Sequence, residues 1–383
     1  MSRRILYVQF TDPAGYPPIE HSSRLFAERG WEVFMVGMDS AGGLNLKLPV
    51  HPGISVKKFG FVQGGLRQKL QYIRFLFFTL YWTWWWRPSW IYASETLSCP
   101  VVWLVKKLTN INVLYHEHDS PNAGRTGSAF MDAACVYRAK LARDAELCVL
   151  PERARLLEFL ETTKRTKLAF CVWNCPRLDE IADLNSDRDR ELIIYYHGSI
   201  TSARLPPQLI VAASRFKGAV RVRVAGYETL GSTGYIRELT MLAAKHGAAG
   251  MVEPLGTFPR REDLLRSASK AHVGLSLMPK QSEDINMRHM VGASNKPFDY
   301  MASGLPLLVS DLPEWVATFV EPGYGRACDP DDPDSIEAAL RWYIDHPEER
   351  REMSRQGQDK IREAWNYESM FAGVLAEIES KST

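Results

Sequence analysis

Short apolar runs alternate with helical segments along almost the whole chain, and this alternation most constrains the fold. The first run is "RILYVQF", and it is followed by a segment with helical spacing that ends at Gly30. We expect strands at residues 4–10, 31–38, 55–61, 89–95, 111–119, 146–151 and 167–174, and helices at 19–30, 99–110, 128–145 and 152–163. Such alternation predicts βαβ units and a mainly parallel sheet.

The alternation stops at residues 176–191 and then restarts, which predicts a linker and a second domain. Expected strands follow at 192–199, 220–227, 251–256, 272–279, 305–311 and 325–330, with helices at about 206–215, 234–246, 260–268, 296–302 and 313–320. A helical tail begins at Asp334 and breaks near "NYES". We therefore predict an α/β fold with two facing, doubly wound Rossmann-like domains and a cleft between them. The domains would span 1–178 and 190–365, with a last helix at about 366–383 that packs back on the first.

Composition agrees with a folded protein of two domains, because 383 residues exceed one ordinary core. A net charge of +2 does not indicate a polyanionic partner such as a nucleic acid. The six cysteines show no zinc-type spacing, which favours reduced thiols in a cytoplasmic protein. The first apolar run is short, which predicts a strand rather than a signal peptide.

The loop after the first strand reads "TDPAGYPP" and lacks the G-x-G-x-x-G fingerprint of dinucleotide binding. The hypothesis of a nicotinamide-dependent dehydrogenase therefore loses its main support. Gly15 still allows a tight turn close to the expected ligand, although a plain proline–glycine loop explains the same residues.

The strand "INVLY" runs directly into "HEHD". Alternation along a strand puts His116 and His118 on one side and Glu117 on the other. Ionisable groups at the carboxyl end of a parallel strand lie where such sheets bind ligands, so we predict a functional role for His118 and Asp119. A hydrogen-bonded turn is the alternative, and a zinc site would need a further ligand.

The second domain opens with "YYHGSITSARLPPQL", a pattern that suits a phosphate site. Gly198 allows a tight turn, and Arg204 precedes a helix whose free N–H groups can bind an anion. An exposed arginine at a helix start would look the same.

A second helix start, "SNKPFDYMASG", carries the most informative pattern. Ser294 or Asn295 can cap the helix, and Pro297 suits its first turn. Lys296 adds positive charge to the helix dipole, which favours an anion. Asp299 would be stabilised by the dipole even without a ligand, but a carboxylate beside an anion site can also bind ribose hydroxyls.

The stretch "SNKPFDYMASGLPLLVSDLPEW" resembles the signature helix of family 4 retaining glycosyltransferases, which have the GT-B fold. "YHEHD" is similar to that family's histidine at the end of an N-domain strand. The resemblance implies that His118 lies by the sugar and acceptor and that Arg204 and Lys296 neutralise the diphosphate. It also implies that Asp299 binds the ribose.

The chain departs from that family at two positions. Val291 stands where many members have a first glutamate, and Ser199 stands where many have a phosphate-binding arginine. Arg288 or His289 could supply the missing charge.

The resemblance implies transfer of a hexosyl group from a nucleoside diphosphate-sugar to an unidentified acceptor, with retention of anomeric configuration. No cofactor and no metal are expected, because fixed positive groups stabilise the leaving diphosphate. Two alternatives stay open, namely a nucleotide-sugar epimerase of the same fold and a degenerate scaffold that binds a sugar or a lipid.

Residues 65–87 combine apolar and basic side chains at helical spacing. Leu66, Leu70, Ile73, Phe77, Leu80 and Trp84 form one stripe, and Phe75, Phe78, Trp82 and Trp85 form a second on nearly the opposite face. A core covers one stripe only, and the second would bind a membrane surface, a neighbouring domain element or a second copy. The membrane interpretation predicts a peripheral protein at the inner face of the cytoplasmic membrane and a lipid-linked acceptor, as in surface polysaccharide assembly.

Overall fold

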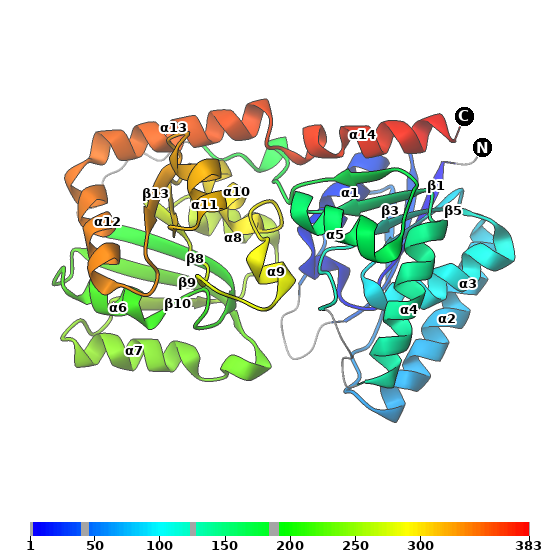
Figure 1. Cartoon of the computed structure of the whole chain (residues 1–383), viewed down its shortest axis with the longest axis horizontal. Coiled ribbons are helices and arrows are strands. Elements are labelled where there is room, and N and C mark those ends of the chain that lie inside the picture. The colour runs from blue at the N-terminus through cyan, green and yellow to red at the C-terminus, as the bar shows by residue number, and fades with distance from the viewer. Residues whose placement is uncertain (1–2, 40–45, 123–127, 184–190, 383) are drawn as a thin grey trace. The chain divides into compact units, whose positions relative to one another are not determined.

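The computed structural model describes residues 3–39, 46–122, 128–183 and 191–382, which form two compact units (Figure 1). Unit 1 comprises Met1–Asn174, Asp284–Ala293 and Tyr367–Thr383. Unit 2 comprises Cys175–Glu283 and Ser294–Asn366. Each unit is built around one parallel sheet.

Unit 1 has a sheet of seven strands in the order β3-β2-β1-β4-β5-β6-β7. Its strands are β1 (Arg4–Val8), β2 (Glu32–Met38), β3 (Ile54–Phe59), β4 (Trp90–Ser94), β5 (Asn112–His116), β6 (Leu147–Leu150) and β7 (Ala169–Cys171). Its helices are α1 (Pro17–Glu28), α2 (Leu66–Trp86), α3 (Cys99–Thr109), α4 (Ala129–Asp144), α5 (Arg153–Thr163), α9 (Ile285–Arg288) and α14 (Tyr367–Ser380).

Both faces of the unit 1 sheet are buried. Leu6 and Val8 of β1 belong to the core on one face, and Ile5 and Tyr7 belong to the core on the other. This arrangement explains why the strands read as continuous apolar runs, since helices cover a parallel sheet on both sides. The last helix, α14, lies beside α1 on one of these faces, as predicted for the chain's end (Figure 1).

Unit 2 has a sheet of six strands in the order β10-β9-β8-β11-β12-β13. Its strands are β8 (Leu192–Ile200), β9 (Val220–Glu228), β10 (Val252–Gly256), β11 (Val273–Ser276), β12 (Leu307–Ser310) and β13 (Gly325–Cys328). Its helices are α6 (Pro207–Ser214), α7 (Tyr235–Lys245), α8 (Arg261–Ala268), α10 (Asn295–Ala302), α11 (Pro313–Trp315), α12 (Pro333–Asp345) and α13 (Pro347–Glu363).

The strands predicted from the sequence are confirmed, with small shifts at their ends. Two of the predicted helical segments differ from the prediction. The helix expected at 313–320 continues from α11 as a π-helical turn over Val316–Val320. The helical tail has an additional break at His346, before Pro347 begins α13. Part of the predicted linker, residues 184–190, lies outside the described residues.

The short segment Asp284–Ala293 belongs to unit 1, although the chain on either side of it belongs to unit 2. Asn286 holds the segment in place, because its side chain accepts a hydrogen bond from the Ser120 backbone N–H (2.8 Å) and donates one to the Ser120 carbonyl (2.9 Å). The backbone N–H of Asn174 donates to the Gly292 carbonyl (2.8 Å). Nothing in the local sequence pattern of this segment predicted these contacts.

The helix α2 covers the sheet with one of its two apolar stripes. Phe75 is buried in the core, and Phe78 and Trp82 pack against it. The other stripe, from Leu66 to Trp84, is largely exposed, except that Leu80 packs against the core. Trp85, which was predicted to lie on the covered stripe, is exposed. Within the described residues, no helix combines the length and the apolar character needed to cross a bilayer.

Both sheets reverse their strand order next to their first strand. The reversal lies between β1 and β4 in unit 1 and between β8 and β11 in unit 2. Ligands of open α/β sheets bind at the carboxyl ends of the strands at such positions. The candidate residues of each unit lie at or near these two strand ends.

Candidate functional site

The carboxyl end of β8 in unit 2 is shaped by two paired glycines. Gly198 has φ +113° and Gly226 has φ +141°, a region that residues with a side chain rarely adopt. A Cβ atom on Gly226 would lie 1.9 Å from the carbonyl oxygen of Gly198. A Cβ atom on Gly198 would lie 3.3 Å from the Nζ of Lys296. The glycines therefore bring the β8 backbone close to a lysine from α10.

The N-terminus of α10 presents backbone N–H groups that its own side chains do not cap. Ser294 occupies the N-cap position as predicted, but its side chain makes no cap hydrogen bond. Among the described residues, the buried Oδ1 of Asn295 has no hydrogen-bond partner. Free N–H groups at a helix start are suited to bind an anion.

Lys296 is buried at this helix start, with 9% of its side chain exposed. Its Nζ lies 5.6 Å from the centre of the Tyr196 ring, and it makes no ion pair or hydrogen bond with any described residue. Burial lowers the pKa of Lys296 well below its usual value, and the charge of Arg204 lowers it further. A buried lysine without an ion-pair or hydrogen-bond partner loses stability in its charged form, and a bound anion would restore the stability of that form.

The charge of Arg204 lowers the pKa of both Lys296 and Tyr196, so Arg204 lies near these two side chains. Arg204 is half-buried in the turn between β8 and α6. The structure thus brings together Gly198, Arg204, Ser294, Asn295 and Lys296, which the sequence analysis took from two segments about 100 residues apart. Two cations and a helix N-terminus match the charge of a diphosphate.

Asp299 is fully buried, and both of its carboxylate oxygens accept hydrogen bonds from Arg261 at 2.5 and 3.1 Å. Arg261 also donates to both oxygens of Glu180, at 2.6 and 3.1 Å. Burial alone would lower the pKa of Arg261, but Asp299 and Glu180 raise it well above its usual value. Asp299 is thus part of an ion cluster, and its predicted contact with ribose hydroxyls stays a prediction.

Arg261 and Glu180 were not predicted from the sequence. Arg261 begins α8, and Glu180 lies in a short turn after the first unit. By sequence pattern both look like ordinary charged surface residues, and only the fold brings them close to Asp299. His197 also belongs to this cluster, because its Nε2 lies 3.4 Å from Asp299, while burial lowers its pKa well below the usual value.

The position of α10 depends on a close approach to the sheet. A Cβ atom on Gly274 of β11 would lie 2.3 Å from the Tyr300 ring, so glycine is required for this contact. The Tyr300 hydroxyl accepts a hydrogen bond from the His197 backbone N–H (3.0 Å). This contact fixes α10, and with it Lys296 and Asp299, against the end of β8.

In unit 1, His118 lies just beyond the end of β5 with 5% of its side chain exposed. Its Nε2 lies 3.1 Å from the hydroxyl of Ser94, and its ring contacts Tyr16 and His116. The two histidine rings are 4.0 Å apart, so they lie on one side of the chain as predicted. Among the described residues, the buried Nδ1 of His118 has no hydrogen-bond partner.

Glu117 points away from these histidines and has a structural role. It forms a buried ion pair with Arg138 (2.5 and 2.6 Å) and accepts hydrogen bonds from Tyr115 and Ser120. This network ties β5 to α4 and fixes the backbone from which His118 projects. The strand alternation therefore separates a packing residue from a candidate site residue.

Two further residues beside His118 were not anticipated. Glu95 follows β4 with φ +69°, a strained conformation for a residue other than glycine. Burial, followed by Asp119 and Glu117, raises the pKa of Glu95 well above its usual value. Arg155 of α5 donates to the His118 carbonyl. The position of Glu95 at the end of a predicted strand was a usable signal in the sequence.

The other predicted residues of unit 1 lie closer to solvent. Asp119 is exposed next to His118. Gly15 is exposed in a short 3₁₀ turn over Pro13–Gly15, and its φ is not in the left-handed region. The turn itself is formed by Asp12, whose side chain accepts a hydrogen bond from the Ala14 N–H (3.0 Å). In the described part of the chain, no group of three or more His, Cys, Asp or Glu side chains is arranged to hold a metal ion.

The positions that depart from family 4 lie in different surroundings. Val291 is buried in the segment Asp284–Ala293 of unit 1. Ser199 lies on β8, next to Gly198. Arg288 is exposed and His289 is half-buried in the same segment as Val291, and whether either supplies charge to a ligand stays a prediction.

The buried histidines predict a stability that falls with acidification. Burial, followed by Arg155, lowers the pKa of His118 from 6.5 to about 3. Below pH 6.5 the unfolded chain takes up a proton that the folded chain refuses until about pH 3, so folding weakens as the pH falls. We expect about 1.4 kcal/mol of lost stability per pH unit for this histidine. Urea unfolding between pH 7 and pH 5 should show a smaller pH dependence in His118→Gln than in the parent. An unchanged dependence in His118→Gln would contradict the low pKa.

Comparison with known proteins supports the architecture. Residues 208–376 match the family model described as "Glycosyl transferase-like". No protein of curated function matches the sequence. Solved structures match nearly the full chain at low identity. The Anabaena protein Alr3699/HepE in complex with UDP-glucose is 15% identical, with a TM-score of 0.73 and coverage of 98% of this chain and 99% of that one.

Two synthases align similarly. The sucrose-phosphate synthase of Thermosynechococcus elongatus is 16% identical with a TM-score of 0.71, and the match covers 99% of this chain and 100% of that one. A trehalose-6-phosphate synthase analysed for glycosyltransfer with retention is 13% identical with a TM-score of 0.66, and the match covers 99% of both chains. The chain has the GT-B fold. In GT-B terms, unit 1 is the N-terminal Rossmann-like domain and unit 2 is the C-terminal one, which contains most of the matched range.

Proposed function

We propose that this protein is a glycosyltransferase that binds a nucleoside diphosphate-sugar in unit 2. The observation that carries the proposal is Lys296, a buried lysine at the uncapped start of α10 that has no ion-pair or hydrogen-bond partner among the described residues. Arg204 acts on the same site. A diphosphate would satisfy the N–H groups and both cations at once.

Two comparisons support this assignment. The "Glycosyl transferase-like" model matches the chain from residue 208, which includes α10 and Lys296. A protein with the same fold has been crystallised with UDP and with UDP-glucose. A uridine diphosphate-sugar is therefore the first donor to test.

The proposed reaction breaks the bond between C1 of the sugar and the β-phosphate oxygen and forms a bond between C1 and an acceptor oxygen. The acceptor hydroxyl proton passes to the departing phosphate. Lys296, Arg204 and the α10 N-terminus stabilise the negative charge that develops on the diphosphate, which is electrostatic catalysis without a metal. The transferred group is a hexosyl unit, and its configuration is retained because the acceptor attacks the face from which the phosphate leaves.

His118 and Asp119 are the proposed residues for the sugar and the acceptor. The low pKa of His118 means that its ring is neutral near pH 7. A neutral ring with a free Nδ1 can exchange a hydrogen bond with a hydroxyl group, so we assign His118 to orientation of the reacting groups rather than to charge stabilisation.

The proposed acceptor is a lipid-linked molecule, as in the assembly of surface polysaccharide, and the protein acts at the cytoplasmic face of a membrane. The support for this part is the exposed apolar face of α2. It is a separate part of the proposal, because the donor site does not depend on it.

Thermal unfolding with nucleotides tests the donor assignment directly. A ligand that binds only the folded protein raises its unfolding temperature. We expect one of UDP, GDP, ADP or dTDP, and the corresponding sugar nucleotide, to raise it equally with and without EDTA. Product analysis of the shifting donor should then show transfer or hydrolysis, and His118→Ala should keep the shift and lose about 100-fold in transfer. No shift with any nucleotide would overturn the proposal, and a shift abolished by EDTA would overturn its metal-free form.

A further inference from the structure

The helix α2 presents an apolar face to solvent. Trp84 is 78% exposed, Leu66 73% and Phe77 64%, which is unusual for residues of this size. The exposed apolar residues are Leu66, Leu70, Ile73, Phe77, Tyr81, Trp84 and Trp85. Six of them follow one another at intervals of three or four residues, so they lie on a single side of the helix. We call this set the α2 face.

The helix is long enough to make this face a continuous surface. Its 21 residues extend over about 30 Å at 1.5 Å per residue. The opposite side of α2 is anchored in unit 1, where Phe75 is buried and the hydroxyls of Thr79 and Thr83 donate to backbone carbonyls one turn earlier. The α2 face therefore points to solvent, because the opposite side of the helix is packed in the core of unit 1.

Basic residues border the α2 face on both sides. At about 100° per residue, Arg67 and Arg74 fall along one edge of the face, and Lys69 falls along the other. Arg87 directly follows the helix, at the residue where the chain leaves the helical conformation. All four are exposed, and α2 contains no acidic residue.

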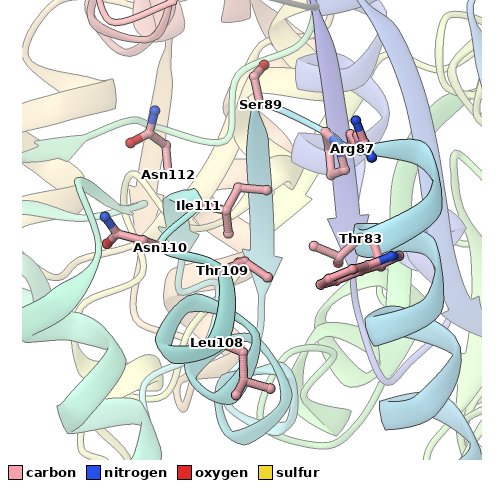
Figure 2. A pocket seen from close by; sticks show the side chains of 10 residues that line it. Thr83, Arg87, Ser89, Leu108, Thr109, Asn110, Ile111 and Asn112 are labelled. Atoms are coloured by element: carbon pink, nitrogen blue, oxygen red, sulfur yellow. The ribbon is translucent and has the colours of Figure 1, made fainter.

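A pocket extends the surface beyond the end of α2. Its volume is about 660 Å³. Figure 2 shows that Thr83 and Arg87 line it from the α2 side and that residues 108–112 line it from the end of α3 and the start of β5. Leu108, which is also exposed, and Trp84 both line this pocket. The lining thus combines apolar side chains with Arg87, Asn110 and Asn112, a mixture that suits a lipid headgroup.

We infer that the α2 face docks on a membrane surface that contains anionic lipids, with α2 lying in the plane of the interface. Aromatic and aliphatic side chains would enter the boundary between headgroups and acyl chains, and the bordering arginines and lysine would contact lipid phosphates. Charge complementarity favours this occupant over a second copy of the chain, because two α2 faces in contact would bring their basic borders together. The inference extends the proposal of a lipid-linked acceptor. Its evidence is the α2 face alone, so it does not depend on the donor site.

Sedimentation of the full-length protein with vesicles tests the inference. Vesicles of phosphatidylcholine and phosphatidylglycerol in equal parts should bind the protein, and vesicles of phosphatidylcholine alone should bind it much less. The variant Phe77→Gln/Trp84→Gln should bind the anionic vesicles at least about tenfold more weakly. Both residues are exposed, so its unfolding temperature should not change. The variant Leu157→Gln, which removes an exposed leucine from α5, is the matched control and should bind as the parent does.

A charge-reversal pair separates the electrostatic contribution. Arg67→Glu/Arg74→Glu should weaken binding to anionic vesicles by about 100-fold at low salt. Arg237→Glu/Lys245→Glu makes the same change in net charge on the exposed side of α7 in unit 2, and it should bind as the parent does.

Two results would overturn the inference. One is equal binding of parent and Phe77→Gln/Trp84→Gln to anionic vesicles, or no binding by either. The other is a dimer of the parent in solution that this variant converts to monomers without any vesicle binding, which would make the α2 face an interface between copies. The nucleotide-induced shift of the unfolding temperature, measured on the same variants, should stay at the parental value. If the donor assignment is wrong, the parent will show no nucleotide-induced shift, but it will still bind vesicles.

Discussion

Replacement of Lys296 by methionine is expected to reduce affinity for the nucleoside diphosphate-sugar by about 100-fold. Methionine keeps most of the side-chain volume but removes the charge that lies at the α10 N-terminus beside Gly198. The fold should be as stable as the parent or more stable, because the free protein no longer buries an amine that lacks an ion-pair or hydrogen-bond partner. Titration calorimetry with the donor and urea unfolding measure the two effects separately.

Lys280→Met is the matched control for this experiment. Lys280 is also in unit 2, but it is exposed and forms surface ion pairs with Asp311 and Asp329. Its replacement should leave donor affinity unchanged and alter stability by less than about 1 kcal/mol. If Lys296→Met lost stability while it kept donor affinity, Lys296 would be a residue of the helix start and not of a ligand site.

Replacement of Arg261 by methionine is expected to cost about 3–5 kcal/mol of unfolding free energy. Arg261 is the cation between two carboxylates, and its loss leaves the fully buried Asp299 and the mostly buried Glu180 without their partner. An uncompensated buried carboxylate must either remain charged in a poorly solvated place or take up a proton. Urea unfolding at pH 7 measures the loss.

A second substitution identifies the cause of that loss. Asp299→Asn in the Arg261→Met background removes one of the uncompensated charges, so it should recover part of the lost stability. Arg223→Met, which removes the partially exposed pair with Glu253, is the control and should cost about 1 kcal/mol or less. A loss below about 1 kcal/mol in Arg261→Met would show that the cluster is well solvated, and it would leave Asp299 accessible to a ribose.

The fold followed from local pattern because each strand of a doubly wound sheet is buried on both faces. Runs such as Leu192–Ile200 are too apolar for a surface element and too short for a buried helix. The helix start at Ser294 was also recognisable, since a polar residue before Lys-Pro marks a first turn. The broken helical tail was harder, because His346 interrupts it without a glycine.

Of the candidate site, only the residues at strand ends and helix starts were predicted from the sequence. Lys296 and His118 have such positions, and the structure places both beside other polar groups in their own units. Arg261 has no local signal, because its partner Asp299 is 38 residues away in sequence and the two meet only when α8 and α10 pack on the same sheet. The same holds for Asn286, which joins unit 1 from within the sequence of unit 2.

Local sequence pattern was enough to predict the two parallel sheets, the glycines and basic residues near the end of β8, and the two apolar stripes on α2. It was enough because periodicity and turn chemistry act over a few residues. Packing of distant segments determines which side of α2 the core covers, which buried basic residue lacks an ion pair, and that Asp299 pairs with Arg261. These outcomes depend on contacts between segments far apart in the chain, and burial and pairing of charge exist only once those segments have packed.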